Sequence, residues 1–292
     1  MCEFCTKHGE GKKWYLQMKN YSEELIHHAL THDEQEITGG ADRVTWLQRF
    51  FGDFVMPAIT GKASTDEHSS TEAAPAKVPV GLREMLRRQQ LVHFGQVIPI
   101  EDVERILDGA SSITRMPCGC RFLTTGKTDQ RYCFGLGMDK WGVFGKFPEA
   151  ASSLETLEKS EAKRIIRSYD EEGLMHSVWT GVTPYVVGIC NCDHDCGAYR
   201  ATIEKRTAQV FFRAEYVCQV DWELCTGCKS CLRQCQFGSQ FYSSALSKVY
   251  IDPARCYGCG VCRTACTAGA IRLLPRTDVP EAAKLWLRKS GE

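Results

Sequence analysis

The sequence predicts an α+β protein with a helical N-terminal segment, a mixed α/β module that contains cysteine pairs, and a C-terminal domain organised around eight cysteines. Apolar residues recur at helical spacing in several segments. An apolar run rich in β-branched residues covers residues 174–189. The chain has 17 cysteines, and most of them fall into short, regularly spaced groups. These observations define the class and the order of the parts.

The chain divides into five stretches. They are an N-terminal helical segment with a Cys-x2-Cys pair, a polar linker, the α/β module, the cysteine-rich domain and a C-terminal helix, with bounds 1–59, 60–80, 81–214, 215–276 and 277–292. The linker contains almost nothing that a core could bury, as is typical of poorly ordered connections. The C-terminal helix is expected over residues 277–289, with Pro280 near its start.

The overall composition excludes some classes of function. Lys plus Arg and Asp plus Glu both number 36, so no strong field attracts nucleic acid or an anionic membrane. We therefore expect no nucleic-acid partner. No apolar run reaches the length of a membrane span, and no signal-peptide pattern opens the chain. So many cysteines without a secretion signal indicate a reducing, cytoplasmic location.

The N-terminal segment opens with Cys2, Cys5 and His8, which supply three of the four ligands of a zinc site or form a loose tail with two incidental thiols. A helix is expected from Tyr21, and residues 42–55 form a second, phenylalanine-rich amphipathic helix that we expect to pack in the core.

Helices are also expected in the α/β module. Residues 82–88 form a short basic amphipathic helix. Pro99 begins another helix, which ends at Gly109. Ser160 is expected to cap a helix that runs to about Glu172, before Gly173.

Two Cys-x-Cys pairs, Cys118 with Cys120 and Cys190 with Cys192, lie in this module. On extended backbone, residues i and i+2 project from the same face, so each pair would offer two thiolates side by side. If the fold brings the pairs together, four thiolates share one centre.

Cys133 and Cys196 follow the pairs as alternate ligands. Three interpretations stay open. The cysteines could bind an iron–sulfur cluster, which would be the third beside the two expected in the cysteine-rich domain described below, or a zinc ion with His194 as a further ligand. They could also be buried free cysteines that pack as small hydrophobic residues. Cys218, alone in an apolar strand, is expected to be a core residue.

The cysteine-rich domain contains two runs with the same internal spacing, C-x2-C-x2-C-x3-C. Their members are Cys225, Cys228, Cys231, Cys235, and Cys256, Cys259, Cys262, Cys266. Thiolates are soft ligands suited to iron–sulfur clusters. Zinc sites use separated C-x2-C pairs, and disulfides need an oxidising compartment, so both fit this doubled spacing less well.

This stretch resembles the bacterial two-cluster ferredoxin domain, which holds two 4Fe–4S clusters. The resemblance implies that the fourth cysteine of each run binds the other cluster. One ligand set is then Cys225, Cys228, Cys231 and Cys266, and the other is Cys256, Cys259, Cys262 and Cys235. The family places Pro after each fourth cysteine, whereas Gln236 and Thr267 stand there in this chain. The missing Pro frees a backbone N–H at each site.

The Met-Cys-Glu-Phe-Cys opening and the Pro-Cys-x-Cys-Arg and Cys-Asn-Cys blocks also resemble larger ferredoxin-type iron–sulfur proteins of anaerobic bacteria. The sequence therefore favours an electron-transfer protein with two 4Fe–4S clusters and a candidate third metal site, working with a partner oxidoreductase. An iron–sulfur subunit of a multi-subunit redox enzyme and a redox-sensing regulator are the alternatives. We find no catalytic constellation and expect no activity by the chain alone.

Overall fold

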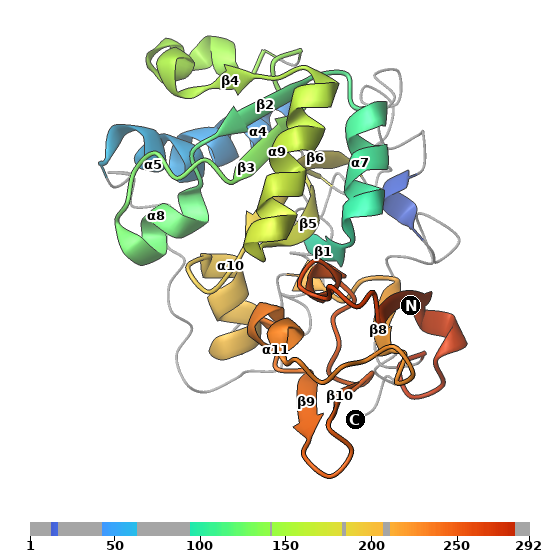
Figure 1. Cartoon of the computed structure of the whole chain (residues 1–292). Helices are drawn as coiled ribbons and strands as arrows, with labels where there is room; N and C mark the ends of the chain where they lie inside the picture. The colour runs from blue at the N-terminus through green and yellow to red at the C-terminus, as the bar shows by residue number, and fades with distance from the viewer. Residues whose placement is uncertain are drawn as a thin grey trace, which may run out of the picture.

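The computed structural model describes residues 13–16, 43–62, 94–140, 142–182, 185–206 and 211–283. Figure 1 shows a larger α/β unit with a smaller cysteine-rich unit against one end of it. Helices and mainly antiparallel sheets are both present, so the α+β class is confirmed. The expected N-terminal cysteine site, the helix from Tyr21, the basic helix at 82–88 and most of the linker lie outside the described residues.

The larger unit is built on a sheet whose seven described strands have the order β4-β2-β3-β6-β5-β1-β7. All neighbours are antiparallel except β1 and β7. The strands are β1 (Gly95–Ile98), β2 (Ile113–Met116), β3 (Cys133–Leu136), β4 (Glu155–Thr156), β5 (Met175–Thr180), β6 (Val186–Cys192) and β7 (Phe211–Phe212). The predicted apolar run at 174–189 became β5 and most of β6, whereas β1 to β4 are too short to show a clear alternation.

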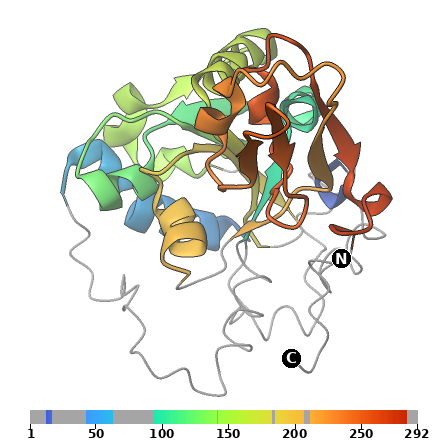
Figure 2. The ribbon, with the colours of Figure 1, turned by 60° about the horizontal axis from the view of Figure 1, so that its bottom comes forward.

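Two helices cover one face of this sheet. α7 (Ile100–Gly109) and α9 (Lys159–Glu172) lie side by side there (Figures 1 and 2). Both confirm the predicted helices, and Gly173 ends α9 in the left-handed conformation, with φ of 93°. The predicted cap is wrong: Glu158 holds the N-cap position without a side-chain bond, so Ser160 lies inside the first turn.

The other face of the sheet packs against the N-terminal segment. α4 (Arg43–Phe50), a π-helical turn η3 (Phe51–Val55) and α5 (Met56–Thr60) form one nearly continuous helix. Leu47 and Phe51 are fully buried in a core that also contains Met138 and Val143. This confirms that the phenylalanine-rich helix belongs to the core. The described residues 43–60 therefore share a core with the α/β module.

Short helices complete the larger unit. They are η1 (Trp14–Leu16), α8 (Gly119–Thr125), η4 (Phe144–Lys146), η5 (Pro148–Ser153), α10 (Gly197–Tyr199) and the π-helical turn η6 (Arg200–Glu204). Trp14 in η1 is fully buried, and its indole N–H donates to Gln96 Oε1 at 2.6 Å. No helix among the described residues is long and apolar enough to cross a bilayer.

The cysteine-rich unit contains two two-stranded antiparallel sheets. β8 (Tyr216–Val220) pairs with β11 (Ile271–Pro275), and β9 (Gln240–Ser243) pairs with β10 (Lys248–Ile251). α11 (Ser230–Gln234) and η7 (Val261–Arg263) each contain the third cysteine of a run, Cys231 and Cys262. The unit meets the larger unit near the C-terminal end of α9 and the N-terminal end of α7, where Arg263 forms a two-point ion pair with Glu101 at 2.6 and 2.9 Å.

The segment after β11 differs from the prediction. Residues 276–278 form a 3-10 turn, η8 (Arg276–Asp278), and residues 279–283 continue in turns, so no α-helix occupies the described part of 277–289. The fully buried Arg276 side chain explains this path. It donates to the carbonyls of Ala214, Tyr216 and Cys256, and its backbone N–H donates to Glu215 O.

We predict that Arg276→Met destabilises the cysteine-rich unit by roughly 3 kcal/mol or more, because three buried carbonyls lose a charged donor. Burial already lowers the pKa of Arg276 to about 10, and at neutral pH the guanidinium remains charged. The measurement is the urea midpoint of the anaerobically purified protein, followed by circular dichroism.

Arg272→Met is the matched control for this prediction. Arg272 is 64% exposed and pairs with Asp221 at the surface, so its loss should cost less than about 1 kcal/mol. Equal midpoints for the two variants would contradict the role assigned to Arg276.

Candidate metal centres

The first set of four cysteines lines a small cavity in the cysteine-rich unit. Its volume is about 20 Å³, and its sulfur-bearing residues are Cys225, Cys228, Cys231 and Cys266. The backbone N–H of Ala270 donates to Cys266 Sγ at 3.2 Å. Such N–H···S bonds favour a charged thiolate over a thiol, so the site fits a thiolate-bound cluster.

The second set lines a cavity of about 10 Å³, which contains Cys235, Cys256, Cys259 and Cys262. The N–H groups of Cys218 and Gly258 both donate to Cys256 Sγ at 3.4 Å. Each run of cysteines therefore supplies three residues to one cavity and its fourth residue to the other. This is the arrangement that the ligand sets require, and these donor sets also fit 4Fe–4S clusters.

Glycines allow the two cysteine loops to fold so tightly. Gly258, with φ of 73°, lies so close to Tyr216 that an added Cβ would overlap the Tyr216 carbonyl. Gly227, with φ of 70°, approaches Ser247 in the same way. Both positions need a residue without a side chain.

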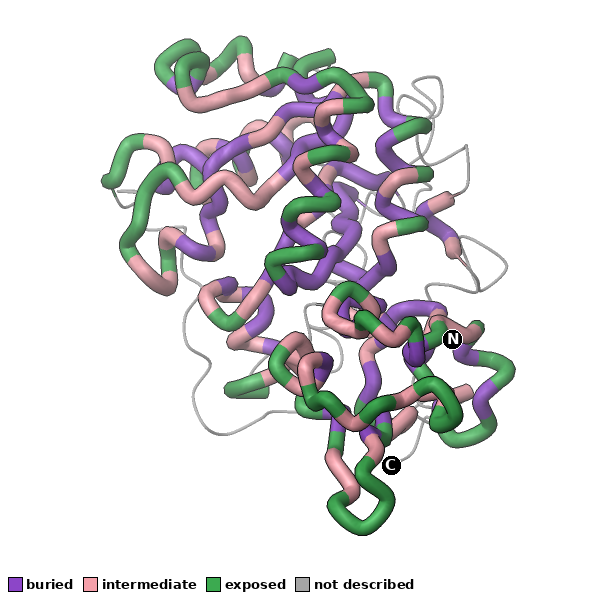
Figure 3. The backbone as a smooth tube through the Cα atoms, in the orientation of Figure 1, coloured by how far each residue is buried: buried purple, intermediate pink, exposed green. Residues whose placement is uncertain are grey.

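The two sets differ in their exposure to solvent. Cys228 of the first set is exposed and Cys231 is buried, whereas the second set has no exposed member, with Cys256 and Cys262 buried. Figure 3 shows that buried backbone concentrates in the larger unit and that exposed backbone dominates the far end of the cysteine-rich unit. Large exposed apolar side chains gather on the same unit: Trp222, Leu224, Phe241, Leu246 and Tyr250. The first set thus faces outward, and the second faces the larger unit.

Cys218 is buried, as expected of a core residue. It also lines the cavity of the second set, a position that its isolated place in the sequence did not reveal. It is a ninth cysteine beside the two four-cysteine sets.

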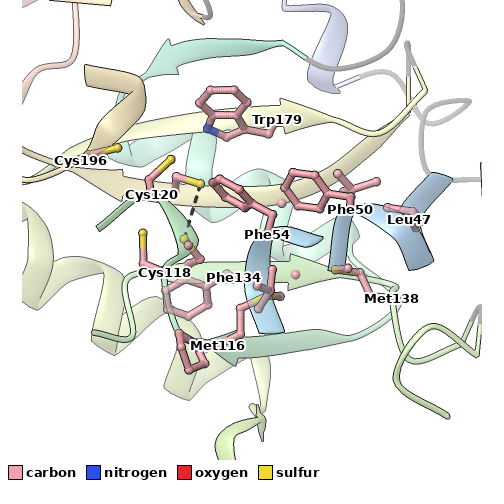
Figure 4. A pocket seen from close by; sticks show the side chains of 18 of the residues that line it. Leu47, Phe50, Phe54, Met116, Cys118, Cys120, Phe134, Met138, Trp179 and Cys196 are labelled. Carbon is pink, nitrogen blue, oxygen red and sulfur yellow. Dashed lines mark hydrogen bonds between the residues drawn. The ribbon is translucent and has the colours of Figure 1, made fainter. Parts of the chain in front are cut away.

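The larger unit brings six cysteines to one cavity of about 90 Å³ beneath the sheet: Cys118, Cys120, Cys133, Cys190, Cys192 and Cys196. Cys133 of β3 lies directly opposite Cys190 of β6, and their Sγ atoms are 3.8 Å apart. Cys192 shares the face of Cys190 because it is two residues further along β6. Both Cys-x-Cys pairs and both alternates therefore meet at one place (Figure 4).

The geometry of one pair differs from the expectation. Cys190 and Cys192 do lie on extended backbone, but Cys118 is the N-cap of α8 and Cys120 lies in its first turn. A helix therefore turns the Cys118 and Cys120 side chains away from the parallel arrangement of a strand. His194 does not line the cavity; it is 64% exposed, and its Nδ1 lies 3.0 Å from Glu204 Oε1.

Hydrogen bonds link the six thiols, and two of the thiols have a lowered pKa as a result. Hydrogen bonds from Cys118 and Cys190 lower the pKa of Cys133. Hydrogen bonds from Cys120 and Cys192 lower the pKa of Cys196 in the same way. Cys133 and Cys196, named only as alternates from the sequence, are thus the two that lose a proton most readily. They are therefore the members of the set that are most readily present as thiolates.

Arg121 brings a positive charge to this set. It is only 4% exposed, forms an ion pair with Asp193 at 2.9 Å, and stacks over the Tyr132 ring at 4.1 Å. The charge of Arg121 also contributes to the lowered pKa of Cys133. Among the described residues, no three potential ligands converge on a point that would hold a single ion; the sulfurs surround a cavity instead.

Gln236 connects the second ferredoxin-type set with the six cysteines. Its side-chain amide donates to Gly173 O at 2.6 Å and to Cys192 O at 3.3 Å, and Tyr199 Oη donates to its backbone carbonyl. Gln236 directly follows Cys235, in the position where the resembling family has Pro. From the sequence we expected only a freed backbone N–H at this position and missed the side-chain contact with the larger unit.

Comparison with known proteins identifies the cysteine-rich unit. Residues 224–270 match the family model of the 4Fe-4S dicluster domain. The chain is 35% identical over 57 residues to the archaeal-type glutamate synthase (NADPH) of Thermotoga maritima, which covers 20% of this chain and 11% of the relative. It is 37% identical over 106 residues to the indolepyruvate oxidoreductase subunit IorA of Pyrococcus horikoshii, which covers 36% of this chain and 16% of the relative.

The chain therefore spans only 11% to 16% of the length of these curated relatives. The resemblance to a dicluster domain is confirmed for residues 224–270, and an iron–sulfur role in electron transfer is supported.

Proposed function

We propose that the protein transfers single electrons between a partner oxidoreductase and a metal centre of its own, through two 4Fe–4S clusters. The observation that carries this proposal is the arrangement of eight cysteines into two cavities, within a segment that matches the dicluster domain. The proposed ligands are Cys225, Cys228, Cys231 and Cys266 at one cavity, and Cys256, Cys259, Cys262 and Cys235 at the other.

A bound 4Fe–4S cluster supplies a one-electron redox centre at each of these sites. The protein supplies the thiolates, the N–H···S bonds at Cys256 and Cys266, and different degrees of burial. Hydrogen bonds to sulfur and lower exposure both tune a reduction potential. The two sites should therefore differ in potential.

The exposed side of the first set is the proposed docking place of the redox partner. Cys228 is exposed there, and the same unit presents the exposed side chains of Trp222 and Leu224. Exposed aromatic and aliphatic residues are typical anchors of protein interfaces. The relatives named glutamate synthase and oxidoreductase subunit support a partner of the oxidoreductase class.

A second candidate is that the chain is an iron–sulfur subunit of a stable multi-subunit redox enzyme. The relative that is itself named as a subunit favours it. Isolation of the protein in a fixed ratio with another polypeptide would distinguish it from a free carrier. For both candidates we propose a cytoplasmic, reducing environment, because so many free thiols need one.

We predict that the reduced protein shows interacting cluster signals in electron paramagnetic resonance, because the two four-cysteine sets exchange their fourth members and so lie close together. A spectrum that is the sum of two isolated centres would contradict the ligand sets. Turnover of a small organic substrate by the protein alone would contradict the role of a carrier.

The six cysteines of the larger unit are proposed to hold a third metal centre. Cys118, Cys120, Cys190 and Cys192 were the predicted ligands, and the lowered pKa values of Cys133 and Cys196 make these two residues equally suitable. All-sulfur coordination suits both zinc and an iron–sulfur cluster. We favour the cluster because six thiols exceed the four ligands of one zinc ion and two cluster sites already lie in this chain. The exposed side chain of His194 lies outside the cavity lining and does not support a zinc site that includes it.

We predict that the double variant Cys190→Ser, Cys192→Ser loses one metal centre and retains the two ferredoxin-type clusters. Iron and acid-labile sulfide analysis should fall from about twelve irons to about eight if the third centre is a 4Fe–4S cluster. Residues 110–200 should also become more sensitive to protease, because metal binding at a site made of distant segments stabilises the fold.

The reciprocal control is Cys228→Ser, which should affect the first ferredoxin-type cluster and leave residues 110–200 resistant to protease. If the double variant has wild-type metal content and wild-type resistance, the six residues are packing cysteines and the third centre is refuted.

We predict that Gln236→Leu slows reduction of the third centre relative to the two clusters. The Gln236 side chain donates to the carbonyls of Gly173 and Cys192, and these bonds join the residue after Cys235 to the six-cysteine site. Each lost hydrogen bond should weaken this contact by about 1 kcal/mol. Freeze-quench electron paramagnetic resonance measures the order of reduction.

Hydrogen exchange near Gly173 and Cys192 should become faster in the same variant, which tests the contact without relying on redox rates. Thr267→Val is the matched control, since Thr267 holds the same position after the other fourth cysteine. Identical behaviour of the two variants would remove Gln236 from the proposed path.

A further inference from the structure

The six-cysteine cavity has two chemically different ends. In Figure 4, Cys118, Cys120 and Cys196 lie at one end, whereas Leu47, Phe50 and Met138 lie at the other, with Phe54 and Trp179 between them. The proposed third metal centre needs only the sulfur end. The apolar end has no role in the electron transfer described above.

The six-cysteine cavity is larger than either of the two cavities that four cysteines line. The two four-cysteine cavities measure about 20 and 10 Å³, although each contains a complete ligand set for a 4Fe–4S cluster. The six-cysteine cavity measures about 90 Å³. By comparison with the other two sites, most of this volume is additional space beside the sulfurs.

The lining at the apolar end offers nothing to a charged or strongly polar molecule. Apart from the thiols, no lining side chain carries a charge, and the indole N–H of Trp179 donates to Ser177 Oγ at 2.9 Å. Apolar cavities of this kind stay dry and bind neutral molecules; a cavity of about 150 Å³ in another protein takes up benzene or xenon. An occupant of the present cavity must therefore be uncharged and no larger than a small ring.

The walls of the apolar end are fixed by tight packing. Phe50 directly precedes the π-helical turn Phe51–Val55 and Phe54 lies within it; their rings stack with centroids 5.1 Å apart. A Cβ at Gly119 would overlap Phe54, so this glycine lets the N-terminal helix approach the Cys118–Cys120 turn. π-helical turns are frequent at functional sites. The space is thus a defined feature of the packing between helix and sheet.

We infer that the apolar end of this cavity binds a small uncharged apolar molecule next to the metal centre held by the six cysteines. The inference rests on the third centre of the proposed function and assigns that centre a ligand. The ligand reaches a redox-active site that the ferredoxin-type unit contacts through Gln236 and Cys192. The protein is then a receptor for that ligand as well as an electron-transfer protein.

Xenon is the probe, because it is uncharged, binds apolar cavities and is directly visible by X-ray diffraction. Crystals of the full chain, purified anaerobically with its metal, are exposed to xenon under pressure. We expect one xenon peak between Leu47 and Trp179 and metal density at the sulfur end. Metal density with no xenon peak between these residues would overturn the inference and leave the third centre intact.

Two variants change the cavity in opposite directions. Leu47→Phe fills the apolar end and should abolish the xenon peak, whereas Phe54→Ala enlarges it and should raise xenon occupancy. Phe144→Ala is the matched control, because Phe144 packs on Phe51 in the same core without lining the cavity. Metal content of each variant, measured in solution, should stay at the wild-type level.

The outcomes separate the inference from the proposal beneath it. If the wild-type crystals show xenon but no metal at the six cysteines, both the third centre and a ligand site beside it are refuted. If neither Leu47→Phe nor Phe54→Ala changes the xenon occupancy, the xenon binds outside the apolar end, and this result also refutes the inference. If one variant fails to fold, the other still tests the location.

Discussion

The pairing of β3 with β6 is the constraint on which the larger unit depends. Its register sets Cys133 opposite Cys190 and Phe134 opposite Ile189. Cys133 and Cys190 line the six-cysteine cavity, whereas Phe134 and Ile189 belong to the core cluster that α7 and α9 cover, and Phe134 also borders the cavity. Because side chains alternate along a strand, a slip of one residue would exchange the two sets. The thiols of Cys133 and Cys190 would then enter an apolar core. One register therefore determines both the stability of the unit and the chemistry of its site.

Of the three cysteine sets, only the first contains an exposed cysteine. Cys228 marks the exposed side, Cys259 lies in the same core cluster as Tyr199 of the larger unit, and Cys192 lies almost completely buried beneath the sheet. Phe237 stacks on Tyr257 with ring centroids 4.3 Å apart and fills the space between the two units. Cys228 is therefore the cysteine that a large partner can approach, whereas Cys192 is shielded from such contact.

The sequence predicted what depends on local spacing. Helical periodicity with Pro99 and Gly173 located α7 and α9, and the doubled cysteine runs located the eight cysteines of the two small cavities. It failed where distant packing decides. Cys118 and Cys120, for which we considered extended backbone, stand at the start of a helix. Arg276 holds the part of the expected C-terminal helix that the structure describes, up to residue 283, in turns. The residues that line the six-cysteine cavity come from segments between α4 and β6 that are far apart in the sequence, and no local sequence pattern predicts that they lie together.

The chain enters and leaves the cysteine-rich unit at the same place. β8 begins at Tyr216, which pairs with Pro275 at the end of β11, and the backbone N–H of Arg276 donates to Glu215 O at 2.8 Å. A unit whose two ends meet can be inserted into another chain, or removed from it, without forcing the host segments apart. This modular architecture is consistent with matches that cover only a small part of much longer relatives. It makes the dicluster unit a transferable part that evolution can join to different redox sites.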